Sequence, residues 1–272
     1  MTNSLNLVDV HCHINHAYFK DKLDGVLQRA QVAGVKAILV SGVNPLANRE
    51  VLELVKEYPQ ILKASLGIYP IDALGLAEGE TGLPRQKGLI NLEKEFEFME
   101  KNLKDVTAIG EVGMDFHWAD KEKTLQQQVD NFRKIIRFAV RVKKPMVIHS
   151  RKAEQECVDI LSEEIKNRQI PVINHCFSGK KKIILQAAAL GHYFSIPANI
   201  VKSSQFQEMV KIVPLRQLLT ETDAPWLSPY SEEKSEPAFV MESIKMIARI
   251  KNISEEEAAE EVWKNYQNIF NH

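Results

Sequence analysis

The chain alternates between short runs of β-branched and other apolar residues and longer segments with helical periodicity. Eight of the apolar runs have the length of a β-strand, and each is followed by a helical segment, as a repeated strand–helix unit requires. The predicted strands are Leu7–His11, Val35–Ser41, Ile61–Gly67, Val106–Gly110, Pro145–His149, Pro171–His175, His192–Ile196 and Gln217–Glu221. The pattern predicts one (β/α)8 TIM barrel, a single domain over residues 1–272, with a doubly wound open sheet as the alternative.

Helical segments separate these strands along the whole chain. The predicted helices are Asp21–Ala33, Asn48–Glu57, Leu92–Leu103, Thr124–Arg141, Ala153–Asn167, Lys180–Leu190 and Phe206–Ile212. The segment Asp72–Gly88 interrupts the rhythm, because its four glycines and Pro84 predict a loop. Two more helices follow the last strand, one over Pro237–Ile250 and one from Ser254, which has capping-box spacing to Glu257.

Composition limits the class of protein but not its activity. With 44% hydrophobic and 26% charged residues, the chain has the composition of a globular protein with a large core. Its net charge of -1 gives no overall signature of nucleic-acid binding, although a local basic rim could still bind phosphate. Three cysteines without a paired framework, no signal peptide and no membrane-length apolar run predict a cytoplasmic protein.

Polar side chains recur where the predicted strands end. The first strand runs into Asp9-Val10-His11-Cys12-His13, and alternate residues of a strand share a face, so His11 and His13 project together. The polar residues that end later strands are Glu111, His149, His175 and Asp223. In an α/β barrel these strand ends meet at the face that carries the active site. Since an unpartnered buried His or carboxylate is costly, five such strand ends favour a metal site over satisfied core groups.

Four histidines and two carboxylates exceed the needs of one tetrahedral ion. They suit two divalent ions about 3.5–4 Å apart, with a carboxylate and a water molecule shared between them. The first and last strands are neighbours in a closed barrel, as are the fifth and sixth. The predicted ligands are His11, His13 and Asp223 for one ion and His149 and His175 for the other, with Glu111 bridging. Magnesium, manganese, zinc, cobalt and nickel all fit such a donor set.

Five motifs, in this order, resemble those of the TatD family of metal-dependent deoxyribonucleases, within the amidohydrolase-like barrels. They are Asp9–His13, Gly110–Asp115, Ile148–Arg151, His175–Gly179 and Thr222–Leu227. The resemblance implies the same barrel and the same two-metal arrangement. It also implies hydrolysis of DNA phosphodiester bonds by a metal-activated water, as an exonuclease on single strands, with RNA as a further possible substrate.

One position departs from the family pattern. Where the family commonly has Gly-x-His-Pro, this chain has Gly67-Ile68-Tyr69-Pro70. Tyrosine donates a hydrogen bond but supplies no cationic proton near neutral pH, so a substrate contact by Tyr69 would differ from that of the family histidine. Arg151 is a candidate phosphate clamp, with a surface salt bridge as the alternative. Trp226 could pack against an unstacked base or against the barrel rim.

In the mechanism that this resemblance implies, Asp223 orients the attacking water and takes up its proton, while Glu111 bridges the ions. Two other function classes remain open. One is hydrolysis of an ester or amide, such as an aminoacyl ester on transfer RNA. Glu111 stands where many amide-cleaving amidohydrolases have a modified lysine, which argues against cyclic amides but not against esters. The other class is a non-catalytic, metal-dependent binding protein. The sequence leaves the oligomeric state open.

Overall fold

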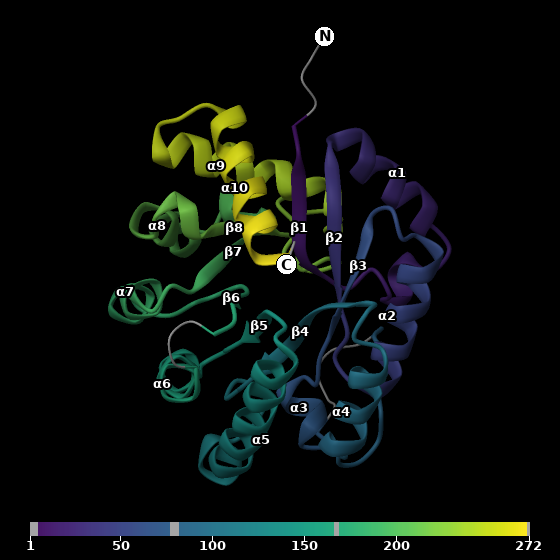
Figure 1. The fold of residues 1–272 in the computed structure, drawn as a ribbon. Coiled ribbons are helices and arrows are strands. Elements are labelled where there is room, and N and C mark those ends of the chain that lie inside the picture. The colour runs from purple at the N-terminus through teal and green to yellow at the C-terminus, as the bar shows by residue number, and fades with distance from the viewer. Residues whose placement is uncertain (1–4, 77–81, 166–168, 271–272) are drawn as a thin grey trace.

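The computed structural model describes residues 5–76, 82–165 and 169–270, and it contains the predicted barrel. Its eight strands form one parallel sheet in the order of the sequence, and the helices lie outside them (Figure 1). The strands are β1 (Leu7–Cys12), β2 (Val35–Ser41), β3 (Leu62–Leu66), β4 (Val106–Gly113), β5 (Met146–His149), β6 (Val172–Asn174), β7 (Tyr193–Pro197) and β8 (Leu218–Glu221). The sequence prediction of eight strand–helix repeats is confirmed.

The helices also lie close to their predicted positions. They are α1 (Leu23–Ala33), α2 (Pro45–Glu57), α3 (Pro70–Ala73), α4 (Leu92–Lys101), α5 (Lys121–Val142), α6 (Glu154–Glu164), α7 (Lys181–Ala189), α8 (Ser204–Ile212), α9 (Val240–Lys251) and α10 (Glu255–Phe270). The predicted capping box is present, because the backbone N–H of Ser254 donates to Glu257 Oε2 and that of Glu257 donates to Ser254 Oγ. The end of the predicted helix Ala153–Asn167 falls partly on residues 166–168, outside the described residues.

Among the boundaries that differ from the prediction, three have a clear local cause. His192 precedes β7 because its backbone N–H bonds to the carbonyl of Ala187 in the last turn of α7. Helix α5 begins before Thr124 because the Asp120 side chain caps it by accepting from Glu122 N. The predicted loop Asp72–Gly88 overlaps the short helix α3, whose first position is taken by Pro70, a residue with φ already suited to a helix start.

The part of this loop after α3 is held by a buried carboxylate. Asp72 is fully buried, accepts a hydrogen bond from Asn44 Nδ2 and forms an ion pair with Arg85. Asn44 in turn caps α2 through two backbone N–H groups and donates to the carbonyl of Pro84. The loop is therefore tied at both sides of residues 77–81, which lie outside the described residues.

Side chains, as well as backbone groups, join the last strand to the first. Hydrogen-bonded strand pairing links each strand from β1 to β7 to the next one, and no β8–β1 ladder is present among the described residues. Asp9 makes this connection, since its two carboxylate oxygens accept from the backbone N–H and the hydroxyl of Thr222. The backbone N–H of Asp223 donates to the carbonyl of His11, which continues the connection at the strand ends.

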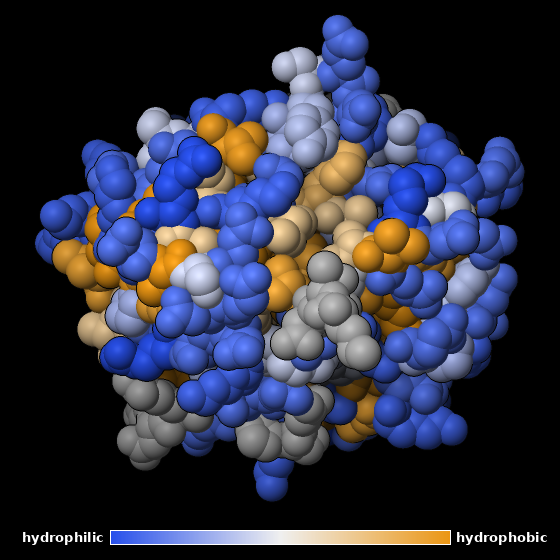
Figure 2. All heavy atoms as spheres, turned by 90° about the horizontal axis from the view of Figure 1, so that it is seen from above, coloured by the Kyte–Doolittle hydropathy of each residue, from blue (hydrophilic) through white to orange (hydrophobic). Residues whose placement is uncertain are grey.

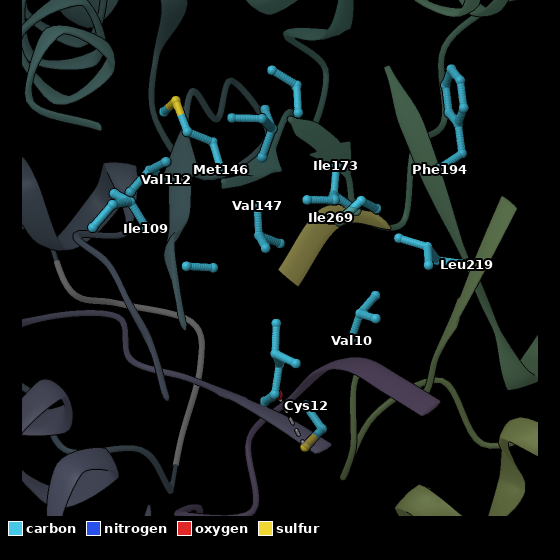
Figure 3. Close-up of a cluster of buried hydrophobic side chains, with 14 of the residues drawn as sticks. Val10, Cys12, Ile109, Val112, Met146, Val147, Ile173, Phe194, Leu219 and Ile269 are labelled. Carbon is cyan, nitrogen blue, oxygen red and sulfur yellow. Dashed lines mark hydrogen bonds between the residues drawn. The ribbon is translucent and has the colours of Figure 1, made fainter. Parts of the chain in front are cut away.

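Below the strand ends the barrel is filled by apolar residues (Figure 3). Ile109 of β4, Val147 of β5 and Ile173 of β6 precede Glu111, His149 and His175, respectively, by two positions. All three are almost completely buried. Figure 3 shows Ile269 of α10 among the buried side chains, and α10 packs against β1 and β8. The C-terminal helix thus contributes to the core that supports the polar strand ends.

The face of the molecule drawn in Figure 2 is mainly hydrophilic. Viewed from the top of Figure 1, charged and polar side chains cover most of the molecule and separate the hydrophobic groups between them (Figure 2). Within the described ranges, no helix combines the length and apolar character needed to cross a bilayer.

Substitution Asp9→Ala should destabilise the fold. It leaves the N–H and hydroxyl of Thr222 without their acceptor at the β8–β1 junction. We expect a loss of about 2–4 kcal/mol in the free energy of unfolding, measured by urea denaturation in the absence of metal. The matched control is Asp24→Ala, which removes an exposed acceptor of the Tyr58 hydroxyl and should cost less than about 1 kcal/mol. Equal effects of the two substitutions would contradict this role of Asp9.

Candidate metal centre

The structure brings six predicted side chains together at the C-terminal ends of the strands, and Glu111 of β4 lies at their centre. Its Oε2 atom is 3.5 Å from His11 Nε2 and 3.4 Å from His13 Nε2. Asp223 Oδ1 approaches the same two nitrogens, at 3.5 and 3.6 Å. The two histidine nitrogens are 3.2 Å apart. Four donor groups from β1, β4 and the end of β8 therefore surround one small volume.

The second oxygen of Glu111 faces a different pair of donors. Its Oε1 atom is 2.8 Å from His149 Nδ1 and 3.3 Å from His175 Nε2, and these two nitrogens are 3.3 Å apart. Ligands of a tetrahedral ion at about 2.1 Å are separated from one another by about 3.4 Å. Apart from the 2.8 Å between Glu111 Oε1 and His149 Nδ1, the observed separations on both sides of Glu111 are close to this value, so the donor set fits metal coordination.

The Nδ1 atoms of His11 and His13 face away from the centre, and each has a hydrogen-bonding partner. Ser41, at the end of β2, provides both of these partners. Its carbonyl accepts from His13 Nδ1 at 3.1 Å, and its hydroxyl lies 3.0 Å from His11 Nδ1. These contacts fix each ring so that Nε2 faces Glu111 and Asp223. A ligand histidine oriented in this way keeps the metal-facing lone pair in place.

Asp115 orients the His149 ring in the same way. Its Oδ2 atom accepts a hydrogen bond from His149 Nε2 at 2.9 Å, which leaves Nδ1 of that ring facing Glu111. The same oxygen accepts from the Tyr69 hydroxyl at 3.0 Å. On the remaining histidine, His175, Nδ1 lies 3.6 Å from Oε2 of the fully buried Glu221.

The charges in the centre are strongly coupled. Burial alone would raise the pKa of Glu111, but hydrogen bonds from the surrounding histidines hold it well below its usual range. Burial likewise acts to lower the pKa of His13, yet its bonds to Asp223 and Glu111 raise it to about 10. The pKa of His149 rises to about 9, since its bonds to Asp115 and Glu111 outweigh burial. Without metal, protons therefore hold the carboxylates and histidines together.

The centre opens into a cavity of about 510 Å³. Asp223 is more exposed than Glu111, with 17% of its side chain accessible to solvent. Both carboxylates line this cavity together with His13. Its backbone lies in the left-handed region, with φ of 52°, where the N–H bond to the His11 carbonyl holds it. The rim of the cavity includes Arg151 and two tryptophans, Trp118 and Trp226.

Not every predicted site residue reaches this cavity. Tyr69 is only 3% exposed and lies behind His149, with its ring edge-on at a centroid distance of 4.9 Å. Sequence reasoning missed the residues that orient the histidines, namely Ser41, Asp115 and Glu221. Asp115 lies inside one of the motifs quoted above, and Glu221 lies two residues before Asp223, but neither position indicates which ring it would contact.

Comparison with known proteins identifies the family. The family model described as "TatD related DNase" matches residues 8–271. The chain belongs to the TatD family. It is 30% identical over 268 residues to human "Deoxyribonuclease TATDN3", covering 98% of this chain and 95% of the human one. It is 31% identical to the "Uncharacterized metal-dependent hydrolase YabD" of Bacillus subtilis, covering 97% and 98% of the two chains.

A solved structure agrees with this assignment at the level of the fold. YJJV, a TatD homologue from Escherichia coli, has a TM-score of 0.83 and 24% sequence identity, with 98% of each chain covered. As a TatD-family member, this protein is a metal-dependent hydrolase.

Metal binding should release protons. In the metal-free protein the pKa values of His13 and His149 lie above their unfolded value near 6.5, so their contribution to stability is complete below that pH. It is lost as pH rises through about 9 to 10. Metal must displace these protons, so its affinity should increase as pH rises toward 9, and binding at pH about 7.5 should release protons. Calorimetric titration in two buffers of different ionisation enthalpy measures the release, and identical heats in both would contradict it.

The partners of His149 should affect metal affinity in a graded way. We expect Asp115→Ala to weaken binding about 10- to 100-fold, because His149 loses the acceptor that orients it. Tyr69→Phe removes one of the donors to Asp115 and should weaken binding about three- to tenfold. Tyr58→Phe is the matched control, since it removes an exposed hydroxyl–carboxylate bond elsewhere and should leave metal affinity unchanged. Calorimetric metal titration checks the order of the three variants.

Proposed function

We propose that this protein is a deoxyribonuclease that hydrolyses phosphodiester bonds with two divalent metal ions. The observation that carries the proposal is the placement of Glu111, whose two oxygens face separate sets of donors. The assigned ligands are His11, His13, Asp223 and Glu111 Oε2 for one ion, and His149, His175 and Glu111 Oε1 for the other. Magnesium, manganese, zinc, cobalt and nickel remain candidates for this mixed donor set.

Two divalent ions, when bound, supply polarisation of the phosphoryl oxygen and acidification of a water molecule. The chain's own residues then position and deprotonate the reacting groups. We assign Asp223 as the proton acceptor, because it lines the cavity beside the other predicted ligands. Bonds from His11 and His13 outweigh its burial and hold its pKa below the usual range, so it is ionised at neutral pH. A carboxylate that is ionised at neutral pH is free to take up the proton of the attacking water.

Arg151 is assigned to the substrate phosphate. It is exposed, lines the cavity, and has no carboxylate within ion-pair distance in the described part of the chain. The alternative surface salt bridge therefore has no support in these residues. For Tyr69 the buried position favours an indirect role: its hydroxyl holds Asp115, and Asp115 orients His149. We propose this positioning role in place of direct contact with the substrate.

Two observations support DNA as the substrate class. Human TATDN3 is named a deoxyribonuclease, and the rim of the cavity carries Arg151, which forms no ion pair with the residues that the structure describes and suits a phosphodiester. We propose exonuclease action on single strands, by a single catalytic domain. RNA and aminoacyl esters are compared as alternative substrates in the test. The three free cysteines support a cytoplasmic location.

The decisive experiment uses single-stranded DNA labelled at either end, with each of the five metals. We expect metal-dependent shortening from one end. Asp223→Asn should lower kcat about 10²- to 10⁴-fold, and Glu111→Ala should abolish metal-dependent cleavage. Asp24→Asn, a change at an exposed carboxylate outside the cavity, is the matched control and should retain full activity.

Circular dichroism and measured metal content separate loss of chemistry from loss of fold. Cleavage that continues at the normal rate in Glu111→Ala would show that another nuclease is present. Metal-dependent hydrolysis of RNA or of an aminoacyl ester, without hydrolysis of DNA, would contradict the proposed substrate but would still support the proposed metal ligands.

A further inference from the structure

Trp118 stands out on the rim of the cavity. It is 43% exposed, although it has one of the largest apolar side chains, and it lines the same cavity as Glu111 and Asp223. The other large hydrophobic residues that are exposed in the described ranges are Tyr18, Val32, Leu46, Leu76, Leu89, Leu125, Leu185 and Tyr230, and none of these lines it. The Trp118 ring is therefore partly exposed to solvent in the cavity that the predicted metal ligands line.

The position of Trp118 is fixed relative to the metal centre by a single carboxylate. Asp115 Oδ1 accepts from the backbone N–H groups of His117 and Trp118, at 2.7 and 2.8 Å. Oδ2 of the same carboxylate accepts from His149. Gln128 further holds Asp115, accepting from its N–H and donating to its carbonyl. The turn that carries Trp118 is therefore ordered by the same group that orients a predicted metal ligand.

A cation lies next to this aromatic surface. The guanidinium carbon of Arg151 is 5.6 Å from the centroid of the Trp118 ring, and His117 packs edge-on against that ring at 4.7 Å. Arg151 follows His149 by two residues, so it too is placed by β5. An aromatic ring beside a guanidinium that has no ion pair in the described ranges offers a stacking surface and a phosphate contact together. These two features match the base and the phosphate of a nucleotide.

Trp226, the other tryptophan on the rim, is placed differently. Its ring packs edge-on against His13 and against His16, each at a centroid distance of 5.3 Å. It is partly buried by these contacts. Of the two possibilities predicted for Trp226 from the sequence, packing against the barrel rim is therefore the one with observed contacts. Trp118, with its larger open surface, is the better candidate for stacking.

We propose that Trp118 and Arg151 form a nucleobase subsite. The base of a nucleotide next to the scissile phosphate stacks on the Trp118 ring, and Arg151 contacts the phosphate of that nucleotide. This inference rests on the proposed function, because it requires a nucleic-acid substrate. It also gives a physical reason for a preference for single strands: a base inside a duplex must be unstacked before it can lie on the ring, whereas an unpaired base is already available.

Binding measurements test the subsite apart from turnover. The metal-loaded protein is titrated with labelled all-phosphorothioate single strands, whose slow hydrolysis leaves time for equilibrium. One strand is intact, and the other has abasic residues at every position near the cleaved end. We expect Trp118→Ala to weaken binding of the intact strand about tenfold and to leave binding of the abasic strand unchanged. Trp118→Phe, which keeps an aromatic face, should restore most of the lost affinity.

The matched control is Tyr18→Ala. Tyr18 is also exposed, with the ammonium group of Lys22 3.1 Å from its ring centroid, but it does not line the cavity. Its loss should leave both affinities unchanged. Equal weakening of the intact and abasic strands by Trp118→Ala, an unchanged affinity for both, or no binding of either strand by the wild-type protein would overturn the subsite.

Cleavage of the corresponding phosphodiester strands then distinguishes the two proposals. If both hold, Trp118→Ala lowers kcat/KM for the intact strand about tenfold and leaves that for the abasic strand unchanged. If wild-type protein cleaves both strands and Trp118→Ala affects them equally, the subsite is wrong and the nuclease assignment stands. If wild-type protein cleaves neither strand with any metal, the proposed function fails. A selective loss of intact-strand binding in Trp118→Ala would still support base stacking in that case.

Discussion

The position of Glu111 between two sets of histidines depends on the rest of the barrel. One carboxylate can serve two sets of donors only if its oxygens are held facing apart, with histidines at 2.8 to 3.5 Å on both sides. Those histidines come from β1, β5 and the end of β6, which meet at one face only in a closed parallel barrel. The apolar layer beneath, which includes Ile109, Val147 and Ile173, holds the strands that carry them.

Partners outside the centre orient most of its ionisable groups. The outer ring nitrogens of three histidines have hydrogen-bonding partners in Ser41 and Asp115, and His175 Nδ1 lies 3.6 Å from Glu221 Oε2, so the inner nitrogens face the carboxylates. In the metal-free protein, the attraction between protonated histidines and ionised carboxylates raises the histidine pKa values and lowers the pKa of Glu111. Divalent ions would take over the role of the shared protons, which links metal binding to pH.

Asp115 connects the centre with its surroundings in two directions. Through its Oδ2 atom it joins His149 to the buried hydroxyl of Tyr69, and through Oδ1 it orders the turn that carries Trp118. A substitution at Asp115 should therefore affect both metal affinity and the proposed base stacking. The departure from the family pattern at Tyr69 lies on the metal side of this connection, away from the cavity wall.

The sequence by itself determined the fold class and the six candidate ligands. The periodicity of a strand is a local property of the sequence, and a barrel brings the strand ends together independently of loop conformation. Residues such as His11, Glu111 and Asp223 could therefore be placed at one face from their sequence positions alone. Only the tertiary structure decided how β8 is joined to β1 through Asp9, that Tyr69 faces Asp115, and that Trp118 is open to the cavity while Trp226 is packed. Those outcomes depend on where side chains of loops and strand ends point, and that direction is set by contacts between residues far apart in the chain.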